Sequence, residues 1–561
     1  MIKLHENTFY APVNVSYAQD LYIAGWAKTD EYYYTTDIQR VAKFAEHFSP
    51  ELMAKVSAGA ESYRESIALK PSEGFDPPVP DALKLYEFQK ADVEYILKRD
   101  STLLAEDAGL GKSAIMTVVA NALDAKSVLI ICPAIAKYNW AMKEWPKWCT
   151  LKLRIGIVEA NDWPENADVV IINYDILHRH KKKIQERVWD YLIVDESHRI
   201  KNSEARRTVM VLGGSVKQLK KDALEAGGEQ IGGGRRYRYP SIRAKKRVFA
   251  TATPLNRPID LWSICEACDP KGLGRDREAF VNRYCAPKMT EFGRDEKGAD
   301  NLNELGALMR AAFMVRHKPE EVLGLPPLRE DIYLLSPIQA IVRMEEQFVH
   351  DNIDALMALA AKQGRKDLNE TSSAREFLRI VGEAILNNVT MLGEPEFLPV
   401  FTEYSRIRKE TGIAKVPAVI DYIDETTADW EIPLVVFGYH REVLLALKEH
   451  YPEAACIVGG MSSKARNEQV DRFQGGETNL FLGNMDAAGE AVTLTRANLL
   501  TFAELDWRGT ALIQARKRIH RISQENPCFV TYLCAADSFD SILYEKGFEK
   551  IENIIGTLDA A

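Results

Sequence analysis

The sequence predicts an α/β protein with two parallel-sheet lobes in tandem. Two series of short, continuous apolar runs carry this prediction, one in each half of the chain, with amphipathic helical stretches between the runs. Strands that are apolar along their whole length are typical of parallel sheets covered by helices on both faces. A chain of 561 residues is long enough to hold several such domains.

The expected strands of the first lobe are 103–105, 127–133, 168–174, 191–194 and 247–250. Those of the second lobe are 432–437, 455–458, 478–482, 499–502 and 529–533. Long helices are expected between the two series, and a proline-rich stretch precedes the first. The predicted segments are a small N-terminal accessory module (1–70), a linker (71–80), the first lobe (81–330), a helical insertion (331–415) and the second lobe (416–561).

Composition excludes some classes of protein. The net charge of −9 argues against a protein that coats nucleic acid, although it leaves room for a local basic track. No apolar run approaches the roughly 20 residues of a membrane span, so we expect no membrane partner. The 8 cysteines are scattered rather than spaced as a disulfide framework, which favours a reducing cytoplasm.

A candidate phosphate loop, Gly109-Leu110-Gly111-Lys112-Ser113, lies between an expected strand and an expected helix. Gly109 and Gly111 allow backbone N–H groups to face phosphate oxygens. Lys112 would neutralise the β- and γ-phosphates, and the Ser113 hydroxyl would ligate magnesium. A glycine-rich turn that binds no phosphate is the alternative, because the strict pattern requires a further glycine ahead of the loop.

An acidic pair, Asp195-Glu196, follows the apolar run 191–194. An aspartate at the end of a buried strand can reach magnesium through water, and the next glutamate can polarise the attacking water. Thr251 and Thr253 end the following strand, where their hydroxyls could hydrogen-bond to the acidic pair and report the state of the γ-phosphate. A simple turn is the alternative for this segment.

Arg518 and Arg521 are three residues apart, so on a helix they would share one face. Arginines supplied by the second lobe would stabilise the charge that phosphoryl transfer spreads over the equatorial oxygens. Gln514 and Gln524 flank the pair. A solvated basic helix is the alternative.

Glycine pairs break the segment 211–245, which we expect to be an excursion from the first lobe. It ends in Arg235-Arg236-Tyr237-Arg238-Tyr239. Arginines interleaved with tyrosines can pair with phosphates and stack on bases, so Arg235, Arg236 and Arg238 are candidate DNA contacts. A flexible, solvated insert is the equal alternative.

Taken in order, these motifs resemble those of the superfamily 2 nucleic-acid motors, and within them the SWI/SNF-like ATPases. That family tolerates acidic residues ahead of its phosphate loop, as at Glu106-Asp107. Gln89 matches its adenine-recognising glutamine, and Asp195–Asn202, with His198, matches its extended acidic box. The segment from Phe502 through the two arginines is most similar to the annealing-helicase branch, in a bacterial or phage member.

The resemblance covers roughly residues 83–545. It implies two RecA-like lobes, ATP and Mg²⁺ as cofactors, and coupling of hydrolysis to movement through His198, Thr251 and Thr253. The implied activity is an ATP hydrolase that translocates on double-stranded DNA and remodels forks, branched DNA or DNA–protein complexes. A strand-separating DNA or RNA helicase and an ATPase subunit of a defence or restriction assembly remain alternatives. We expect a monomer in the cytoplasm, associated with the nucleoid, or in the host cytoplasm if the protein is phage-encoded.

Overall fold

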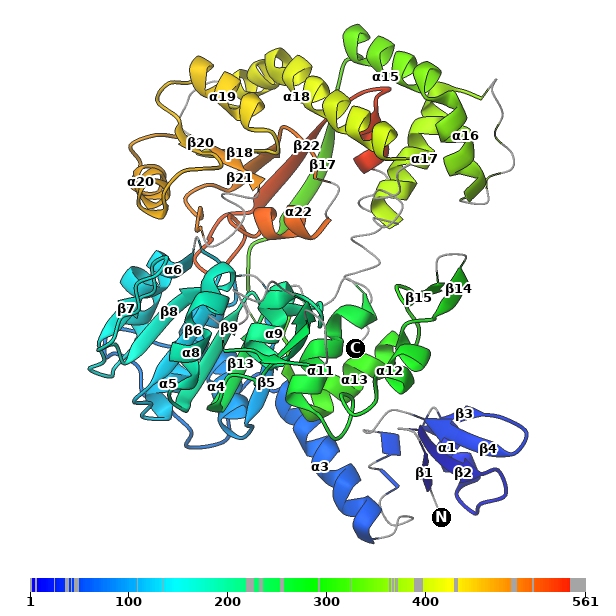
Figure 1. Cartoon of the computed structure of the whole chain (residues 1–561), viewed down its shortest axis with the longest axis vertical. Helices are drawn as coiled ribbons and strands as arrows, with labels where there is room; N and C mark the ends of the chain where they lie inside the picture. Colours follow the sequence, from blue (N-terminus) through cyan, green and yellow to red (C-terminus); the bar gives the residue numbers. More distant parts are fainter. Residues whose placement is uncertain are drawn as a thin grey trace. The chain divides into compact units, whose positions relative to one another are not determined.

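A computed structural model describes most of the chain, which divides into two compact units with the boundary in the sequence between residues 322 and 323 (Figure 1). The residues that it does not describe are 1–2, 6–7, 25, 36–39, 42, 45–49, 108, 135, 218–226, 232–235, 253–256, 291–292, 323, 363–364, 366–367, 369–371, 388–396, 428–431, 486–491, 507–508 and 545–561.

The first unit is built on a seven-stranded sheet in which all strand pairs are parallel. In spatial order its strands are β16 (Met314–Val315), β5 (Ser101–Leu104), β13 (Ala244–Ala250), β9 (Trp189–Asp195), β6 (Val128–Cys132), β8 (Val169–Asn173) and β7 (Ile155–Ile157).

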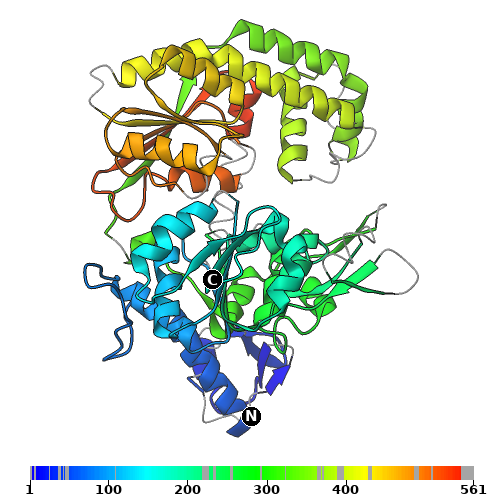
Figure 2. The same cartoon turned by 60° about the vertical axis from the view of Figure 1, so that its left-hand side comes forward.

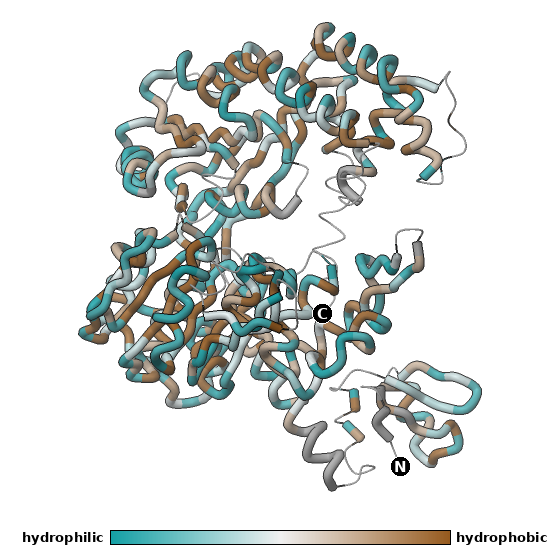
Figure 3. The backbone as a smooth tube through the Cα atoms, viewed as in Figure 1, coloured by the Kyte–Doolittle hydropathy of each residue, from teal (hydrophilic) through white to brown (hydrophobic). Residues whose placement is uncertain are grey.

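Alternate residues of each central strand enter two separate hydrophobic cores, as the continuous apolar runs predict. On β6, Val128 and Ile130 belong to one core, whereas Leu129 and Ile131 belong to the other. The first core is covered by α4 (Glu87–Leu97) and α5 (Lys112–Ala122). The second is covered by α8 (Leu177–Gln185), α9 (Arg206–Leu212), α11 (Trp262–Cys268), α12 (Arg277–Tyr284) and α13 (Leu302–Ala312). Figure 3 shows the hydrophobic strands at the centre of this unit.

The second unit contains a six-stranded sheet, again with only parallel pairs. Its strands are, in spatial order, β17 (Leu328–Leu335), β22 (Cys528–Ala535), β21 (Leu499–Phe502), β18 (Leu434–Gly438), β20 (Leu480–Asn484) and β19 (Ala455–Ile457). Its helices are α15 (Gln339–Asp351), α16 (Ile353–Lys362), α17 (Ala374–Asn387), α18 (Leu398–Thr426), α19 (Arg441–His450), α20 (Ser463–Gln474) and α22 (Gly509–Arg516). Figure 2 shows this unit from a second direction.

The predicted limit of the first lobe, residue 330, falls inside β17, which pairs with β22 over its whole length. This segment therefore belongs to the second sheet, and the boundary lies near residue 322 instead. The predicted limit at 415 falls inside α18, whose Val416, Val419 and Ile423 pack in the core of the second sheet. Long helices do occupy most of the predicted insertion.

The N-terminal segment forms a four-stranded sheet, ordered β1 (Lys3–His5), β2 (Thr8–Pro12), β4 (Tyr32–Thr35) and β3 (Ala27–Lys28), with the helix α1 (Ala18–Ile23). Phe9, Tyr17, Trp26 and Tyr33 give it a small core of its own. A longer helix, α3 (Pro50–Ser66), joins it to the proline-rich segment. Among the described helices, none is long and apolar enough to cross a membrane.

The excursion at 211–245 is a small antiparallel sheet rather than a loop. Its order is β10 (Gly214–Lys217), β12 (Arg236–Tyr239) and β11 (Glu229–Gln230). On β12, Tyr237 and Tyr239 are only 3% and 1% exposed and join the core of the first unit, while Arg236 and Arg238 face solvent. The predicted stacking of these tyrosines on bases is therefore wrong, because the period of a strand turns them inward.

The buried tyrosines give a test of this sheet. We expect Tyr239→Ala to lower the free energy of unfolding by about 3 kcal/mol, because it removes a buried aromatic ring. Arg238→Ala, one residue away and exposed, should change it by no more than about 0.5 kcal/mol. Urea denaturation followed by circular dichroism measures both. Equal, small effects would mean that the segment is a solvated loop.

Candidate active site

The predicted site residues of the first unit meet at one edge of its sheet. In the register of the strands, Ala250 of β13 lies opposite Leu104 of β5 on one side and opposite Asp195 of β9 on the other. Because the three strands are parallel, the loops that follow them emerge side by side at the carboxyl edge, where α/β proteins bind ligands.

The phosphate loop has the backbone that its glycines predict. Gly109 and Gly111 have φ angles of 92° and 82°, in the left-handed region that favours glycine, and Gly111 caps the N-terminus of α5. The Lys112 ammonium donates to the carbonyls of Glu106 (2.9 Å) and Asp107 (3.1 Å). Burial lowers the pKa of Lys112, and nearby carboxylates oppose that shift. Ser113 is the second residue of α5, directly after this lysine, so the loop brings together a cation, a hydroxyl and the N–H groups of a helix N-terminus.

Gln89, which lies in α4, forms a hydrogen bond to this loop. Its Nε2 donates to the Leu110 carbonyl (2.9 Å), and its Oε1 accepts from the Tyr86 N–H (3.0 Å). The side chain is 3% exposed. These hydrogen bonds show that Gln89 supports the phosphate loop. The contact between Gln89 and adenine stays a prediction.

Asp195 is held in place by a residue that the sequence reasoning missed. Its Oδ2 accepts from the Trp140 indole N–H (2.9 Å), and its Oδ1 accepts from the Glu196 N–H (3.0 Å). The Tyr174 hydroxyl donates to its backbone carbonyl. A buried tryptophan requires an acceptor for its N–H, but the sequence does not show which acceptor lies within reach.

The protonation of Asp195 depends on this environment. Burial raises its pKa from 3.8 to about 7, and the carboxylate of Glu196 adds to the shift. The N–H of Trp140 and the ammonium of Lys112 oppose it. A cation bound at this edge would favour the ionised form.

Glu196 begins a chain of contacts that leads to the next strand. It has a left-handed φ of 52°, and its Oε2 lies 3.2 Å from His198 Nδ1. The same nitrogen lies 3.2 Å from Thr251 Oγ1. The structure thus links Thr251 to the acidic pair through His198. Thr253 lies outside the described residues.

The exit from the first sheet also contacts the segment just ahead of the phosphate loop, and the sequence did not predict this contact. Arg316 follows β16, is 5% exposed, and donates to the Ala105 carbonyl (2.8 Å). Its guanidinium lies 3.7 Å from the Asp107 carboxylate. The adjacent strands β16 and β5 bring the two segments together.

In the second unit, Arg518 and Arg521 converge on one backbone carbonyl. Each guanidinium lies 3.4 Å from the Val492 oxygen. Arg518 also donates to the Gln514 carbonyl (3.0 Å), and Arg521 to Thr493 Oγ1 (2.9 Å). The expected helical face is wrong, because α22 ends at Arg516. Turns carry both arginines to the same place instead.

Of the candidate DNA contacts, Arg236 and Arg238 are exposed on β12. Arg236 Nε donates to Ser215 Oγ on the neighbouring strand (2.9 Å). Arg235 lies outside the described residues. Two exposed arginines on one face of a strand can each contact a phosphate.

Comparison with known proteins agrees with this geometry. Residues 88–220 match the SNF2-related domain, which spans the phosphate loop and the acidic pair, and residues 415–523 match the helicase conserved C-terminal domain, which spans the arginines. Over these ranges the chain is similar to the SNF2-related proteins and to the helicase C-terminal domain. The two matched ranges fall in different units of the structure.

Curated relatives are similar over most of the chain. The SWI/SNF-related matrix-associated actin-dependent regulator of chromatin subfamily A-like protein 1 of Drosophila melanogaster is 27% identical over 84% of this chain and 55% of its own length. The human DNA annealing helicase and endonuclease ZRANB3 is 27% identical over 83% of this chain and 40% of its own length. The chain thus spans about half the length, or less, of these relatives.

Among solved structures, the Sulfolobus solfataricus SWI2/SNF2 ATPase core in complex with dsDNA aligns with 85% of this chain and 94% of its own length, at 18% identity and a TM-score of 0.35.

The raised pKa of Asp195 predicts a pH-dependent cost to stability. Between pH 3.8 and about 7 the folded state keeps a proton that the unfolded state has lost, so stability falls as the pH rises through this window. Asp195→Asn carries no such penalty. We expect the Tm of the variant, relative to wild type, to be higher at pH 8 than at pH 5 by about 2–4 °C, measured by differential scanning calorimetry. The same difference at both pH values would contradict a raised pKa.

Proposed function

We propose that the protein hydrolyses ATP with Mg²⁺ and uses the energy to translocate on double-stranded DNA, remodelling forks, branches or DNA–protein complexes. One observation carries the proposal: the phosphate loop and the acidic pair lie at the carboxyl edge of a single parallel sheet, after the two strands that flank β13. The matches to the SNF2-related domain and to the helicase conserved C-terminal domain support it. The relatives named above include a DNA annealing helicase, which favours branched DNA as the substrate.

The residues at this edge suit a nucleotide with its metal. Lys112 is held by two loop carbonyls, from which the stronger charge of a β- or γ-phosphate would draw it. Ser113 and Asp195 supply the oxygen ligands that Mg²⁺ prefers. The metal ion would neutralise phosphate charge as it builds up. Gln89 would read adenine while it keeps the loop in place.

Glu196 is the proposed general base, since it follows the proposed magnesium ligand and would take a proton from the attacking water. His198 and Thr251 would pass the change in charge at Glu196 to the end of β13. Arg518 and Arg521, with Gln514, would stabilise the transition state from the second unit. This division of roles requires both units for hydrolysis and only the first for nucleotide binding. We also propose a monomer that works in the cytoplasm.

The proposal is tested by ATP turnover measured in parallel with duplex DNA, forked DNA, single-stranded DNA and RNA. Duplex and forked DNA should stimulate turnover several-fold more than the other two. Stimulation by RNA or single strands alone would favour a strand-separating helicase. If no nucleic acid has an effect, the protein would instead be an ATPase that works on another partner.

Two variants check that this turnover belongs to the proposed site. Lys112→Ala should abolish turnover and weaken nucleotide binding, because it removes the phosphate-binding cation. Glu196→Gln should keep nucleotide binding and lose turnover by about 10²-fold or more, because it keeps the shape of the base but not its charge. Turnover by a folded Lys112→Ala protein within a few-fold of wild type would remove the phosphate-loop assignment.

The arginines of β12 form a separate part of the proposal. We expect Arg236→Ser with Arg238→Ser to flatten the slope of log affinity against log salt by about 0.9 for each lost phosphate contact on duplex DNA. ATP turnover without DNA should not change. Fluorescence anisotropy over a salt series measures the slope, and an unchanged slope would mean that β12 does not touch DNA.

A further inference from the structure

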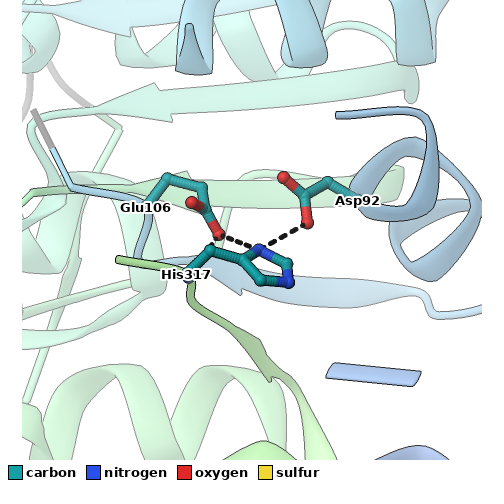
Figure 4. A group of neighbouring side chains, drawn as sticks. All are labelled: Asp92, Glu106 and His317. Atoms are coloured by element: carbon teal, nitrogen blue, oxygen red, sulfur yellow. Dashed lines mark hydrogen bonds and ion pairs between the residues drawn. The ribbon is translucent and has the colours of Figure 1, made fainter. Parts of the chain in front are cut away.

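Beside the phosphate loop lies a cluster of titratable side chains that the proposed reaction does not use. Asp92 comes from α4, Glu106 from the segment after β5, and His317 from the segment after β16 (Figure 4). Their exposed fractions are 0%, 0% and 1%. Two carboxyl groups and an imidazole are thus withdrawn from water at one point, where charge is costly unless it is compensated.

The contacts within the cluster converge on one nitrogen. His317 Nδ1 lies 3.0 Å from Glu106 Oε1 and 3.4 Å from Asp92 Oδ1. The backbone N–H of His317 donates to the same Glu106 oxygen (2.9 Å). A single imidazole N–H faces two carboxylates and can satisfy only one of them well.

The other polar atoms of the three side chains provide a second observation. Within the described part of the chain, no hydrogen-bond partner reaches either oxygen of Asp92, Glu106 Oε2 or His317 Nε2. Asp92 is therefore a fully buried carboxyl group that points at the imidazole (Figure 4). Buried polar atoms are nearly always paired, so a group of unpaired ones indicates a ligand that satisfies them.

The geometry fits a small divalent cation. One ligand atom from each residue lies within 4.8 Å of the other two. Neighbouring ligands bound to an ion at about 2.0–2.2 Å lie roughly 2.8–3.6 Å from one another in octahedral or tetrahedral sites, and the two distances at Nδ1 fall in this range. An imidazole with two carboxylates suits Zn²⁺, Mn²⁺ or Fe²⁺, whereas Mg²⁺ and Ca²⁺ prefer oxygen ligands alone.

We propose that Asp92, Glu106 and His317 bind a divalent transition-metal ion of the Zn²⁺ class, separate from the proposed Mg²⁺ site. The ion would join three segments that are distant in sequence. The first segment is α4, which also carries Gln89. The second leads into the phosphate loop, and the third directly follows Arg316. Its role is structural, because all three side chains are buried. Burial and the charge of Glu106 raise the pKa of Asp92. A proton on Asp92 would therefore compete with the metal ion for this site.

The test is the metal content of the folded protein. The full chain is stripped with a chelator, incubated with zinc chloride, desalted and measured by plasma mass spectrometry. We expect about one zinc ion per chain, and a Tm that falls on chelation and recovers on zinc addition. A folded protein that holds less than about a tenth of an ion, with a Tm insensitive to chelator and zinc, would overturn the proposal and leave a shared proton in the cluster.

Matched variants locate the ion. Asp92→Asn and His317→Gln should each remove the zinc and the response of Tm to the chelator. His350→Gln, whose side chain is 84% exposed in wild type, is the control and should keep both. If the two cluster variants fail to fold, the response of the wild-type Tm to chelator and to added zinc still tests the proposal. Zinc kept by folded cluster variants would place the ion elsewhere and contradict the assignment.

Discussion

The arrangement of the first unit depends on the register of three parallel strands. Because β5, β13 and β9 run in the same direction and end level with one another, the phosphate loop, Thr251 and the acidic pair emerge at the same edge. A shift of one residue in any strand would turn its side chains to the opposite face. The two hydrophobic cores on the faces of the sheet prevent such a shift, since each strand places alternate residues in each core.

Around this edge, buried polar contacts from distant segments hold the reactive groups. Gln89 holds the Leu110 carbonyl, Arg316 holds the Ala105 carbonyl, and Trp140 holds the Asp195 carboxylate. Each of these side chains is at least nine-tenths buried, so each bond forms where water competes weakly. The proposed metal cluster would belong to the same framework. These supports fix the loops before a nucleotide arrives, which is the preorganisation that electrostatic catalysis requires.

The fold class and five strands of each sheet follow from local patterns, and the structure confirms them. What the sequence could not predict depends on contacts between distant residues. β17 reads as a continuation of the first lobe, yet each of its residues pairs with the residue of β22 that lies 200 positions later. Tyr237 and Tyr239 look like an exposed aromatic run until the strand pairing of β12 fixes which face is buried.

For Arg518 and Arg521 too, the sequence predicts the residues but not the backbone that carries them. Spacing predicted that Arg518 and Arg521 share a helical face, but α22 ends before them, and they meet at the Val492 carbonyl through turns. The residue types were sufficient to predict a candidate pair, while the backbone that delivers them was not predictable from spacing. Trp140 was missed for a related reason, since only the fold shows that its N–H reaches Asp195.

The central claim is that hydrolysis needs arginines of the second unit in addition to the nucleotide-binding edge of the first. The most direct measurement compares Arg518→Ala and Arg521→Ala with wild type, for DNA-stimulated ATP turnover and for affinity toward a non-hydrolysable ATP analogue. The account predicts that turnover falls by about 10²-fold or more in each variant, while affinity stays within a few-fold of wild type. Wild-type turnover in both folded variants would contradict it.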